Sequence, residues 1–384
     1  MSLLLASNSV RNAETFGSIR SALLHPDSEK GEVLLNGYIL NHLVESHTMK
    51  VNKYGKGRGH EIKSSGKVYH PFQETLLQNV IVEKVFQTNS KPLLLSFSYD
   101  ENHDQCVVST TFSPSTTAVA ETKTSAKSSE LQNSLQCKHT SLSKVILKLG
   151  DDFRQDVASM TMFKIFNYIW RNSGVMHQSC PISCHEYHTI ATGRRKGISE
   201  YVENCFPLSD IKKIRPLVPG KLEKIVASGA GSFIAAYIIG IRDRHADNIM
   251  IRNDGVLFHI DFGHAMGSTV LMDAQAFAVT KEFRDEIGRA AYDEFIRCCV
   301  RAFRVLRNPE NLNIILNMTP MIFSAIYPNH KVHQFISKTL MLRSDVTSAC
   351  KKMKKMVELA PDSYRTYLKN KIHALATQAK SSSS

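Results

Sequence analysis

Two short polar segments separated by one reverse turn place the strongest restriction on how this chain folds. Residues 240–250 read Gly-Ile-Arg-Asp-Arg-His-Ala-Asp-Asn-Ile-Met, and residues 257–264 read Leu-Phe-His-Ile-Asp-Phe-Gly-His. The Asn-Asp-Gly sequence at 253–255 lies between them and favours a tight hairpin turn. We therefore expect a hairpin that brings Asn248 and Asp261 to neighbouring loops.

The side chains carried by this hairpin suit a metal ion bound to phosphate groups. Amide and carboxylate oxygens are ligands that Mg²⁺ accepts, and in phosphoryl transfer Mg²⁺ bridges the nucleotide phosphates. Protein kinases place a His-Arg-Asp loop before an Asp-Phe-Gly segment, whereas here the triplet at 243–245 is reversed to Asp-Arg-His. A chance Asp-rich hairpin is the alternative, and the combination of both segments at this spacing argues against it.

A second charged cluster, residues 148–156, reads Lys-Leu-Gly-Asp-Asp-Phe-Arg-Gln-Asp. Lys148 lies near the end of an apolar segment, Lys144–Leu149, which predicts a strand. Its ammonium group can then reach out of the sheet toward a phosphate. The alternative is an ordinary edge lysine without a role in binding.

Strand patterns dominate the first half of the chain and helical patterns the second. The expected strands are 79–86, 93–97 and 144–149, and the expected helices are 33–44, 156–170, 222–241, 283–306, 312–325, 346–357 and 364–379. This distribution predicts an α+β protein with two lobes.

The expected domain organisation has three parts. Residues 1–70 form an N-terminal extension, a helix followed by a loose linker over residues 50–67. Residues 71–202 form a strand-rich N-lobe, and residues 203–380 form a helical C-lobe. Residues 109–143 are rich in Ser and Thr and poor in large apolar groups, so we expect a disordered insert there.

Three segments of the chain resemble the phosphatidylinositol 3-/4-kinase family. Its signatures Lys-x-Gly-Asp-Asp-Leu-Arg-Gln-Asp, Gly-x-Gly-Asp-Arg-His-x-x-Asn-Ile-Met and Ile-Asp-Phe-Gly-His correspond to residues 148–156, 240–250 and 260–264. The resemblance covers about residues 70 to 380. It implies a two-lobed protein-kinase-like fold that uses ATP with Mg²⁺, or alternatively Mn²⁺, to phosphorylate an inositol lipid.

The resemblance also implies a role for each matching residue. Asn248 and Asp261 would bind the metal ion, while Asp243 and His245 would activate the inositol hydroxyl, with His245 favoured as the base. The nucleotide would be bound by Ser90, Lys91, Ile146, Lys148, Asp156, Tyr187, Glu200, Val202, Met250, Ile260 and His264. Within this set, Ser90, Lys91, Lys148 and His264 would face phosphates, and Glu200 and Val202 would present backbone groups to adenine.

Three positions depart from the family pattern. Arg242 replaces a glycine before Asp-Arg-His, Phe153 replaces a leucine, and Leu94 stands where phosphoinositide 3-kinases often have tryptophan. None of these changes removes a reacting group, which argues against an inactive relative or a non-catalytic adaptor.

The segment after Asp261 bears on the choice of lipid. Residues 265–276 contain no Lys or Arg, the usual partners of phosphate groups, although Lys281 follows closely. We therefore expect plain phosphatidylinositol as the substrate rather than its bisphosphate.

The C-terminal segment bears on the hydroxyl that is phosphorylated. Tyr364, Leu368, Ile372 and Leu375 recur at helical spacing among basic residues, which predicts an amphipathic helix suited to an anionic bilayer or, alternatively, a packing helix. Such a tail resembles the 3-kinases, so we expect the 3-hydroxyl; phosphatidylinositol 4-kinase and a related Ser/Thr protein kinase are the alternatives.

The formal net charge of +13 fits nucleic acid, an anionic membrane or phosphorylated substrates, and the motifs favour the latter two over nucleic acid. The eight cysteines are scattered and no secretion signal is evident, so we expect a cytoplasmic enzyme peripheral on membranes. The family also leaves room for a regulatory protein subunit.

A zinc site is a side hypothesis. Cys180, Cys184, His185 and His188 lie close in sequence, but the spacing is loose and no second Cys/His pair follows. Core or surface positions are the alternative for these residues.

Overall fold

The computed structural model describes residues 36–45, 60–72, 75–86, 91–99, 144–268, 270, 273–274 and 277–382. Several of the sequence predictions fall wholly or partly outside these residues. They are the disordered insert at 109–143, the phosphate-loop residue Ser90, the first part of the N-terminal helix, residues 50–59 of the linker, and residues 269, 271, 272, 275 and 276 of the segment after Asp261.

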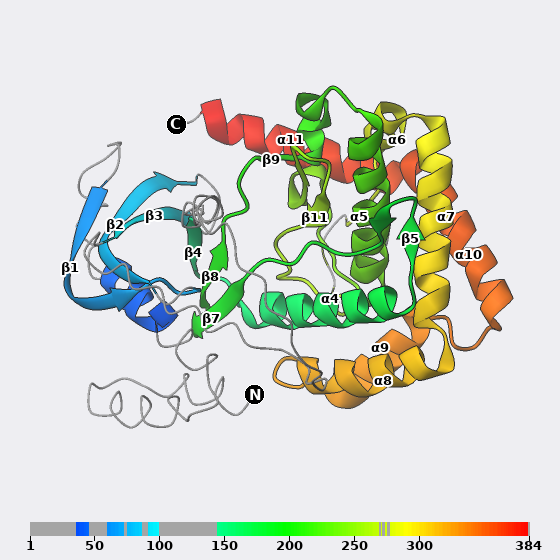
Figure 1. Cartoon of the computed structure of the whole chain (residues 1–384), viewed down its shortest axis with the longest axis horizontal. Helices are drawn as coiled ribbons and strands as arrows, with labels where there is room; N and C mark the ends of the chain where they lie inside the picture. Colours follow the sequence, from blue (N-terminus) through cyan, green and yellow to red (C-terminus); the bar gives the residue numbers. More distant parts are fainter. Residues whose placement is uncertain are drawn as a thin grey trace, which may run out of the picture.

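An antiparallel sheet of six strands forms one side of the molecule, in the spatial order β1-β2-β3-β4-β8-β7 (Figure 1). The strands are β1 (His60–Tyr69), β2 (Leu76–Val85), β3 (Leu93–Tyr99), β4 (Val145–Leu149), β7 (Thr189–Gly193) and β8 (Lys196–Glu200). Strands near 79–86, 93–97 and 144–149 are thus confirmed. The predicted linker over 50–67 is wrong for residues 60–67, since β1 pairs with β2.

One face of this sheet is covered by the helix at residues 36–45. Leu40 and Val44 of that helix are fully buried and join a core with Val80, Leu95 and Leu147. Because side chains alternate across a strand, Ile146 and Lys148 of β4 point away from this core. The sheet therefore presents Lys148 to the rest of the molecule.

Helices form the other side of the molecule and pack around α5, which is buried along most of its length (Figure 1). The helices are α4 (Arg154–Asn172), α5 (Pro219–Ile238), α6 (Lys281–Ile287), α7 (Arg289–Leu306), α8 (Pro309–Phe323), α9 (Asn329–Thr339), α10 (Val346–Leu359) and α11 (Tyr364–Ser382). The α+β class is confirmed. None of the described helices combines the length and apolar character needed to cross a bilayer.

The predicted hairpin is present as β10 (Ile249–Arg252) and β11 (Leu257–His259). Gly255 donates its backbone N–H to the carbonyl of Arg252 and closes the turn. β9 (Cys205–Pro207) pairs with the other edge of β10, and β11 lies against α5. The hairpin is consequently fixed on the helical core.

The helix predicted over 283–306 is interrupted. Gly288 separates α6 from α7, with φ 83° and ψ 157°, a backbone conformation almost restricted to glycine. Helix α9 was not among the predicted helices. The minor strands β5 (Met176–His177) and β6 (Cys180–Pro181) form a short separate hairpin.

Candidate active site

Strand β4 and the segment after β11 bring Lys148 and Asp261 together. The Nζ atom of Lys148 lies 3.4 Å from Oδ2 of Asp261 and 3.8 Å from Oδ2 of Asp151. Burial lowers the pKa of Lys148, but Asp261, Asp156 and Asp151 outweigh it and raise the pKa above its ordinary value. The lysine is therefore a fixed positive charge at this point.

The two predicted metal ligands lie on neighbouring loops, as the sequence indicated. Asn248 ends the short 3₁₀ turn η3 (Ala246–Asn248), and its carbonyl accepts the Ile260 N–H at 3.1 Å. Its Nδ2 donates to the carbonyl of Asp243 at 3.0 Å, which leaves Oδ1 available as an oxygen ligand.

The Asp261 side chain is 47% exposed and accessible to a bound ion. Partial burial raises the pKa of this carboxyl, but Lys148 and Arg244 outweigh it and hold the pKa below its ordinary value. An ionised carboxylate and an amide oxygen on neighbouring loops are donors of the type that a divalent ion of the Mg²⁺ class takes.

Arg244 connects the loop at 240–248 to the hairpin, a role that the sequence did not reveal. Its side chain is buried, and Nη1 donates to the carbonyls of Asn248 at 3.2 Å and Ile260 at 2.6 Å. Nη2 donates to the carbonyl of Asp261. Arg244 thereby fixes the backbone on both sides of the candidate metal ligands. Its only signal in the sequence was its place between Asp243 and His245.

Asp156 lies in the first turn of α4, and its Oδ1 accepts the N–H of Phe262 at 3.3 Å. Desolvation, opposed by the charge of Lys148, raises the pKa of Asp156 to about 7. The ring of Tyr187 is buried against Phe262, with centroids 6.4 Å apart, and its hydroxyl pKa is raised well above the ordinary value by burial and then by Asp156. Tyr187 and Asp156, both predicted to bind the nucleotide, are thus close enough to interact electrostatically.

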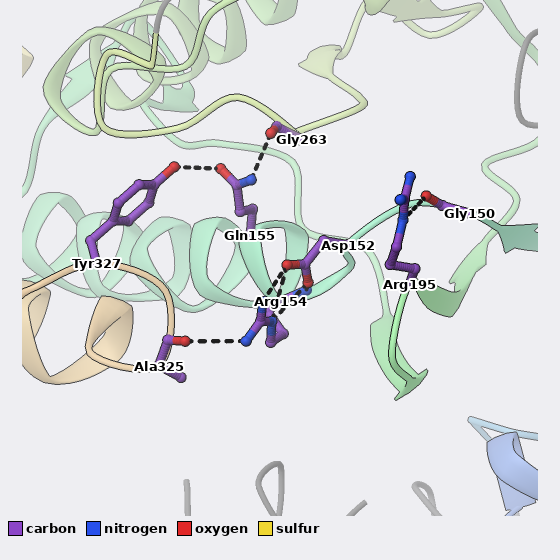
Figure 2. Close-up of polar contacts among 8 residues, drawn as sticks. All are labelled: Gly150, Asp152, Arg154, Gln155, Arg195, Gly263, Ala325 and Tyr327. Carbon is purple, nitrogen blue, oxygen red and sulfur yellow. Dashed lines mark hydrogen bonds and ion pairs between the residues drawn. The ribbon is translucent and has the colours of Figure 1, made fainter. Parts of the chain in front are cut away.

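Gln155 holds the segment that follows Asp261 (Figure 2). Its Nε2 donates to the carbonyl of Gly263 at 2.6 Å, and its Oε1 accepts the N–H of Ala265 at 2.8 Å. The hydroxyl of Tyr327 donates to the same Oε1 at 2.9 Å. Gln155 belongs to the motif at residues 148–156, whereas no local sequence pattern indicated a role for Tyr327.

Figure 2 also shows how the turn before α4 is fastened. Arg154 pairs with Asp152 at 2.5 Å and donates to the carbonyl of Ala325 at 3.2 Å. Arg195 Nε donates to the carbonyl of Gly150 at 2.6 Å. These contacts fix the turn that carries Asp151, beside Lys148.

The two predicted hydroxyl-activating residues are covered by helix α11. Asp243 has a φ of 59°. Its Oδ1 forms an ion pair with Nζ of Lys369 at 2.5 Å. Partial burial raises the pKa of Asp243, but Lys369 outweighs it and lowers the pKa below its ordinary value. The pKa of His245 is lowered to about 4, first by burial and then by His373. His245 is therefore a neutral imidazole near pH 7.

Helix α11 presents polar side chains to this loop. Asn370 Oδ1 accepts the N–H of Ala246 at 2.7 Å, and His373 Nε2 lies 3.0 Å from Oδ2 of Asp247. Figure 1 shows α11, in red, running along the helical side toward the sheet. In the sequence, Lys369 is one of the basic residues of the amphipathic C-terminal segment, and neither Asn370 nor His373 belongs to a recognised motif.

The remaining predicted nucleotide residues are spread along the strands around the site. Ile146 on β4 faces away from the sheet core, and Met250 and Ile260 are half-buried at the two strands of the hairpin. Val202 follows β8 and packs on the helical core. Their positions are compatible with a base-binding surface between sheet and hairpin.

Three other predicted residues have no side-chain contact with Lys148 or Asp261 among the described residues. Glu200 Oε2 accepts the backbone N–H of His188 at 3.0 Å. His264 is exposed, and its carbonyl accepts the N–H of Arg242 at 2.7 Å. Lys91 is exposed just before β3, with φ 43°, and no contact among the described residues joins it to the site.

Arg242, which replaces the family's glycine, contacts the segment at residues 265–276. Its Nη1 lies 3.7 Å from Oδ2 of Asp273, and the N–H of Asp243 donates to Oδ1 of the same carboxylate at 3.1 Å. The charge of Arg242 is thus partly neutralised by Asp273.

The zinc hypothesis for residues 180–188 receives no support. Cys184 is buried and its backbone N–H bonds to Asn167, while His188 is exposed and contacts Glu200. Within the described ranges, the only group of three metal-ligating side chains whose ligand atoms converge comprises His245, Asp247 and His373.

Comparison with protein families identifies a match over the site. The family described as "Phosphatidylinositol 3- and 4-kinase" matches residues 142–214 and 222–330. These ranges include β4, α4, the loop at 240–248 and the hairpin.

Several curated proteins are similar to this chain. It is 28% identical over 266 residues to "Phosphatidylinositol 3-kinase 2" of Dictyostelium discoideum, covering 60% of this chain and 14% of that protein. It is 28% identical over 268 residues to the human "Phosphatidylinositol 4-phosphate 3-kinase C2 domain-containing subunit beta", with 61% and 16% covered. It is 31% identical over 206 residues to "Phosphatidylinositol 3-kinase, nodule isoform" of Glycine max, with 48% and 24% covered. The chain thus matches less than a quarter of the length of these relatives.

Proposed function

We propose that the chain is an ATP-dependent phosphoinositide kinase, because the family described as "Phosphatidylinositol 3- and 4-kinase" matches residues 142–214 and 222–330. The observation that carries the proposal is the convergence of Lys148, Asp261 and Asn248 beside a loop that holds Asp243 and His245. In this proposal, the sheet and the helical part are the two lobes of a kinase, with the nucleotide between them.

The chain's own residues have distinct tasks in the transfer. Lys148 binds the phosphates of ATP through its fixed charge, and Asn248 and Asp261 would hold Mg²⁺ or Mn²⁺, which would offset the negative charge of the nucleotide phosphates. The neutral imidazole of His245 accepts the proton of the inositol hydroxyl, whose oxygen bonds to the γ-phosphorus as the bond to the leaving ADP breaks.

The adenine would lie against Ile146, Met250 and Ile260, with Tyr187 and Asp156 at the back of the pocket. Ser90, Lys91 and His264 would complete the phosphate contacts when ATP binds. Arg244 and Gln155 act through the backbone that they hold and are positioning residues.

The reaction that we propose is the phosphorylation of phosphatidylinositol at its 3-hydroxyl. The names of the similar proteins support the 3-position, since they are phosphatidylinositol 3-kinases. The absence of Lys and Arg over residues 265–276 supports an unphosphorylated ring. A regulatory protein subunit stays a prediction of the family resemblance.

We also propose that the protein is cytoplasmic and binds peripherally to membranes. Tyr364, Tyr367, Ile372 and Leu375 of α11 are between 39% and 71% exposed, while the polar side of the helix faces the loop at 243–247. Apolar side chains directed outward beside basic ones suit an anionic lipid surface.

Incubation with ATP, Mg²⁺ and phosphatidylinositol vesicles tests the proposal, with chromatography of the deacylated product to identify the hydroxyl. Phosphatidylinositol 3-phosphate is the expected product. The 4-phosphate would indicate a 4-kinase, and transfer to a peptide mixture alone would indicate a Ser/Thr protein kinase. Equal turnover on the bisphosphate would overturn the substrate preference.

A further inference from the structure

The contact between α11 and the loop at 243–247 juxtaposes three metal-ligating side chains. The rings of His245 and His373 lie 3.6 Å apart and are 13° from parallel. His373 Nε2 is 3.0 Å from Oδ2 of Asp247. One ligand atom from each of the three residues lies within 4.8 Å of the other two.

A second, independent observation concerns His245. Its side chain is only 7% exposed, and its Nδ1 atom is buried without a hydrogen-bond partner among the described residues. A buried ring nitrogen without a partner carries a desolvation penalty that a metal ion can relieve. The residue thus offers a ligand that the surrounding protein does not use.

We propose that His245, Asp247 and His373 form a site for a transition metal ion of the Zn²⁺ class, bridging the loop at 243–247 and helix α11. Two imidazoles and one carboxylate are a donor set typical of zinc, with a water molecule at the fourth position. This site is separate from the oxygen donors Asn248 and Asp261, so the proposal goes beyond the kinase function.

The geometry requires small side-chain adjustments. Ligand atoms on a tetrahedral ion with bonds of about 2.0–2.2 Å lie roughly 3.3 Å apart. His373 Nε2 and Asp247 Oδ2, 3.0 Å apart, are slightly closer than this, and no separation in the group exceeds it by more than about 1.5 Å. The two rings are 13° from parallel, so the imidazoles must rotate about χ2 for both lone pairs to reach one ion.

The chemistry of the donors separates this site from the magnesium site. Imidazole nitrogen suits Zn²⁺, Ni²⁺ and Cu²⁺, whereas Mg²⁺ prefers carboxylate, carbonyl and water oxygens. Millimolar Mg²⁺ should therefore leave Zn²⁺ in place.

A bound ion would fasten α11 over the candidate base. Lys369 already pairs with Asp243, and Asn370 bonds the backbone of Ala246. Metal ligation by His245 and His373 adds a third link and occupies the imidazole that would accept the hydroxyl proton. Inhibition of lipid phosphorylation by Zn²⁺ follows, and this consequence alone rests on the proposed function.

Titration calorimetry with Zn²⁺ in millimolar Mg²⁺ tests the site without any assay of activity. The wild type should bind one more equivalent of Zn²⁺ than His373→Asn, or bind it at least about tenfold more tightly. Asp247→Asn should behave like His373→Asn. One of the two exposed histidines of α9 supplies the matched control, since His330→Asn should titrate like the wild type.

Two further readouts decide the outcome. Co²⁺ in place of Zn²⁺ should give the intense visible absorption of a tetrahedral site in the wild type and lose it in His373→Asn. Identical Zn²⁺ titrations of the wild type and both site variants would overturn the proposal, as would an equal loss in His330→Asn. If the protein binds Zn²⁺ at the site but has no lipid kinase activity with Mg²⁺ in the absence of Zn²⁺, the kinase function is refuted and the metal site stands.

Discussion

The carboxylate of Asp261 is a group whose removal should strongly slow the proposed transfer. Asp261→Asn should lower the rate by roughly 10²–10³-fold, because the neutral amide neither holds the metal ion as strongly nor balances Lys148. Asn tolerates the positive φ of 61° at this position, so the melting temperature should change little. Vesicle kinase assays and thermal unfolding measure the two quantities.

The neighbouring acid provides the control. Asp151 also lies close to Lys148, at 3.8 Å, but it is not placed among the metal ligands. Asp151→Asn should keep most of the activity. An equal loss in both variants would show that general charge around Lys148, rather than metal binding by Asp261, limits the rate.

Asp156 should make stability depend on pH. Its pKa rises from about 3.8 in the unfolded chain to about 7 in the folded protein. A folded pKa above the unfolded one means that stability is highest below pH 4 and is lost as the pH rises to 7. The full loss is on the order of 4 kcal/mol, from three pKa units.

The variant Asp156→Asn isolates this effect, because its Oδ1 can still accept the Phe262 N–H. Its free energy of unfolding should exceed that of the wild type at pH 8 and match it near pH 4, as measured by urea unfolding. A difference that stays constant across this range would contradict the raised pKa.

The nearness of Lys148 to Asp261, and the placing of Asn248 and Asp261 on neighbouring loops, were predictable at the residue scale, because these residues stand in short motifs of fixed spacing. The contacts of Arg244 and Gln155 were not, since they bond to backbone carbonyls and N–H groups whose positions depend on the fold. His373 lies more than 120 residues from His245 in sequence, and no local pattern joins them.

The break between α6 and α7 is an element-scale feature that depends on one glycine. Gly288→Ala should destabilise the protein by about 1–3 kcal/mol, because a side chain strongly disfavours φ 83° with ψ 157°. Space is not the cause, since nothing lies within 4 Å of the added methyl group. The exposed helical Gly220 is the control, and Gly220→Ala should be neutral or slightly stabilising in thermal unfolding.

The hydroxyl of Tyr327 links the loop after α8 to Gln155 at the start of α4. Tyr327→Phe removes a hydrogen bond worth about 1 kcal/mol and should loosen the segment after Asp261, lowering kcat several-fold. Tyr168→Phe, on the exposed side of α4, should leave kcat unchanged. A fall in stability without a change in kcat would show that Tyr327 has only a structural role.

Helix positions were more predictable than their interruptions. Apolar periodicity continues across Gly288, so the sequence indicates one helix where the backbone forms two. Strand β1 lies in a polar Gly- and Lys-rich stretch, and its pairing with β2 depends on a partner that periodicity does not reveal. A backbone conformation reserved for glycine decides the first case, and tertiary contact decides the second.

At the scale of the whole molecule, α11 combines two faces with different partners. Lys369, Asn370 and His373 contact the loop at 243–247, while Tyr367 and Leu375 are exposed. An amphipathic helix normally buries its apolar side, so the reverse arrangement leaves apolar area for a surface outside the chain. The sequence predicted the amphipathic character, and the fold determines which side faces outward.

The double variant Ile372→Glu/Leu375→Glu should therefore weaken binding to vesicles that contain anionic lipid. Two exposed apolar side chains become charged, which removes their insertion and adds repulsion from the lipid head groups. We expect a roughly tenfold or greater loss in vesicle co-sedimentation, from at least about 1.4 kcal/mol. Met321→Glu, equally exposed on α8, should keep wild-type binding. If both variants bind vesicles as the wild type does, the apolar side of α11 is not the membrane surface.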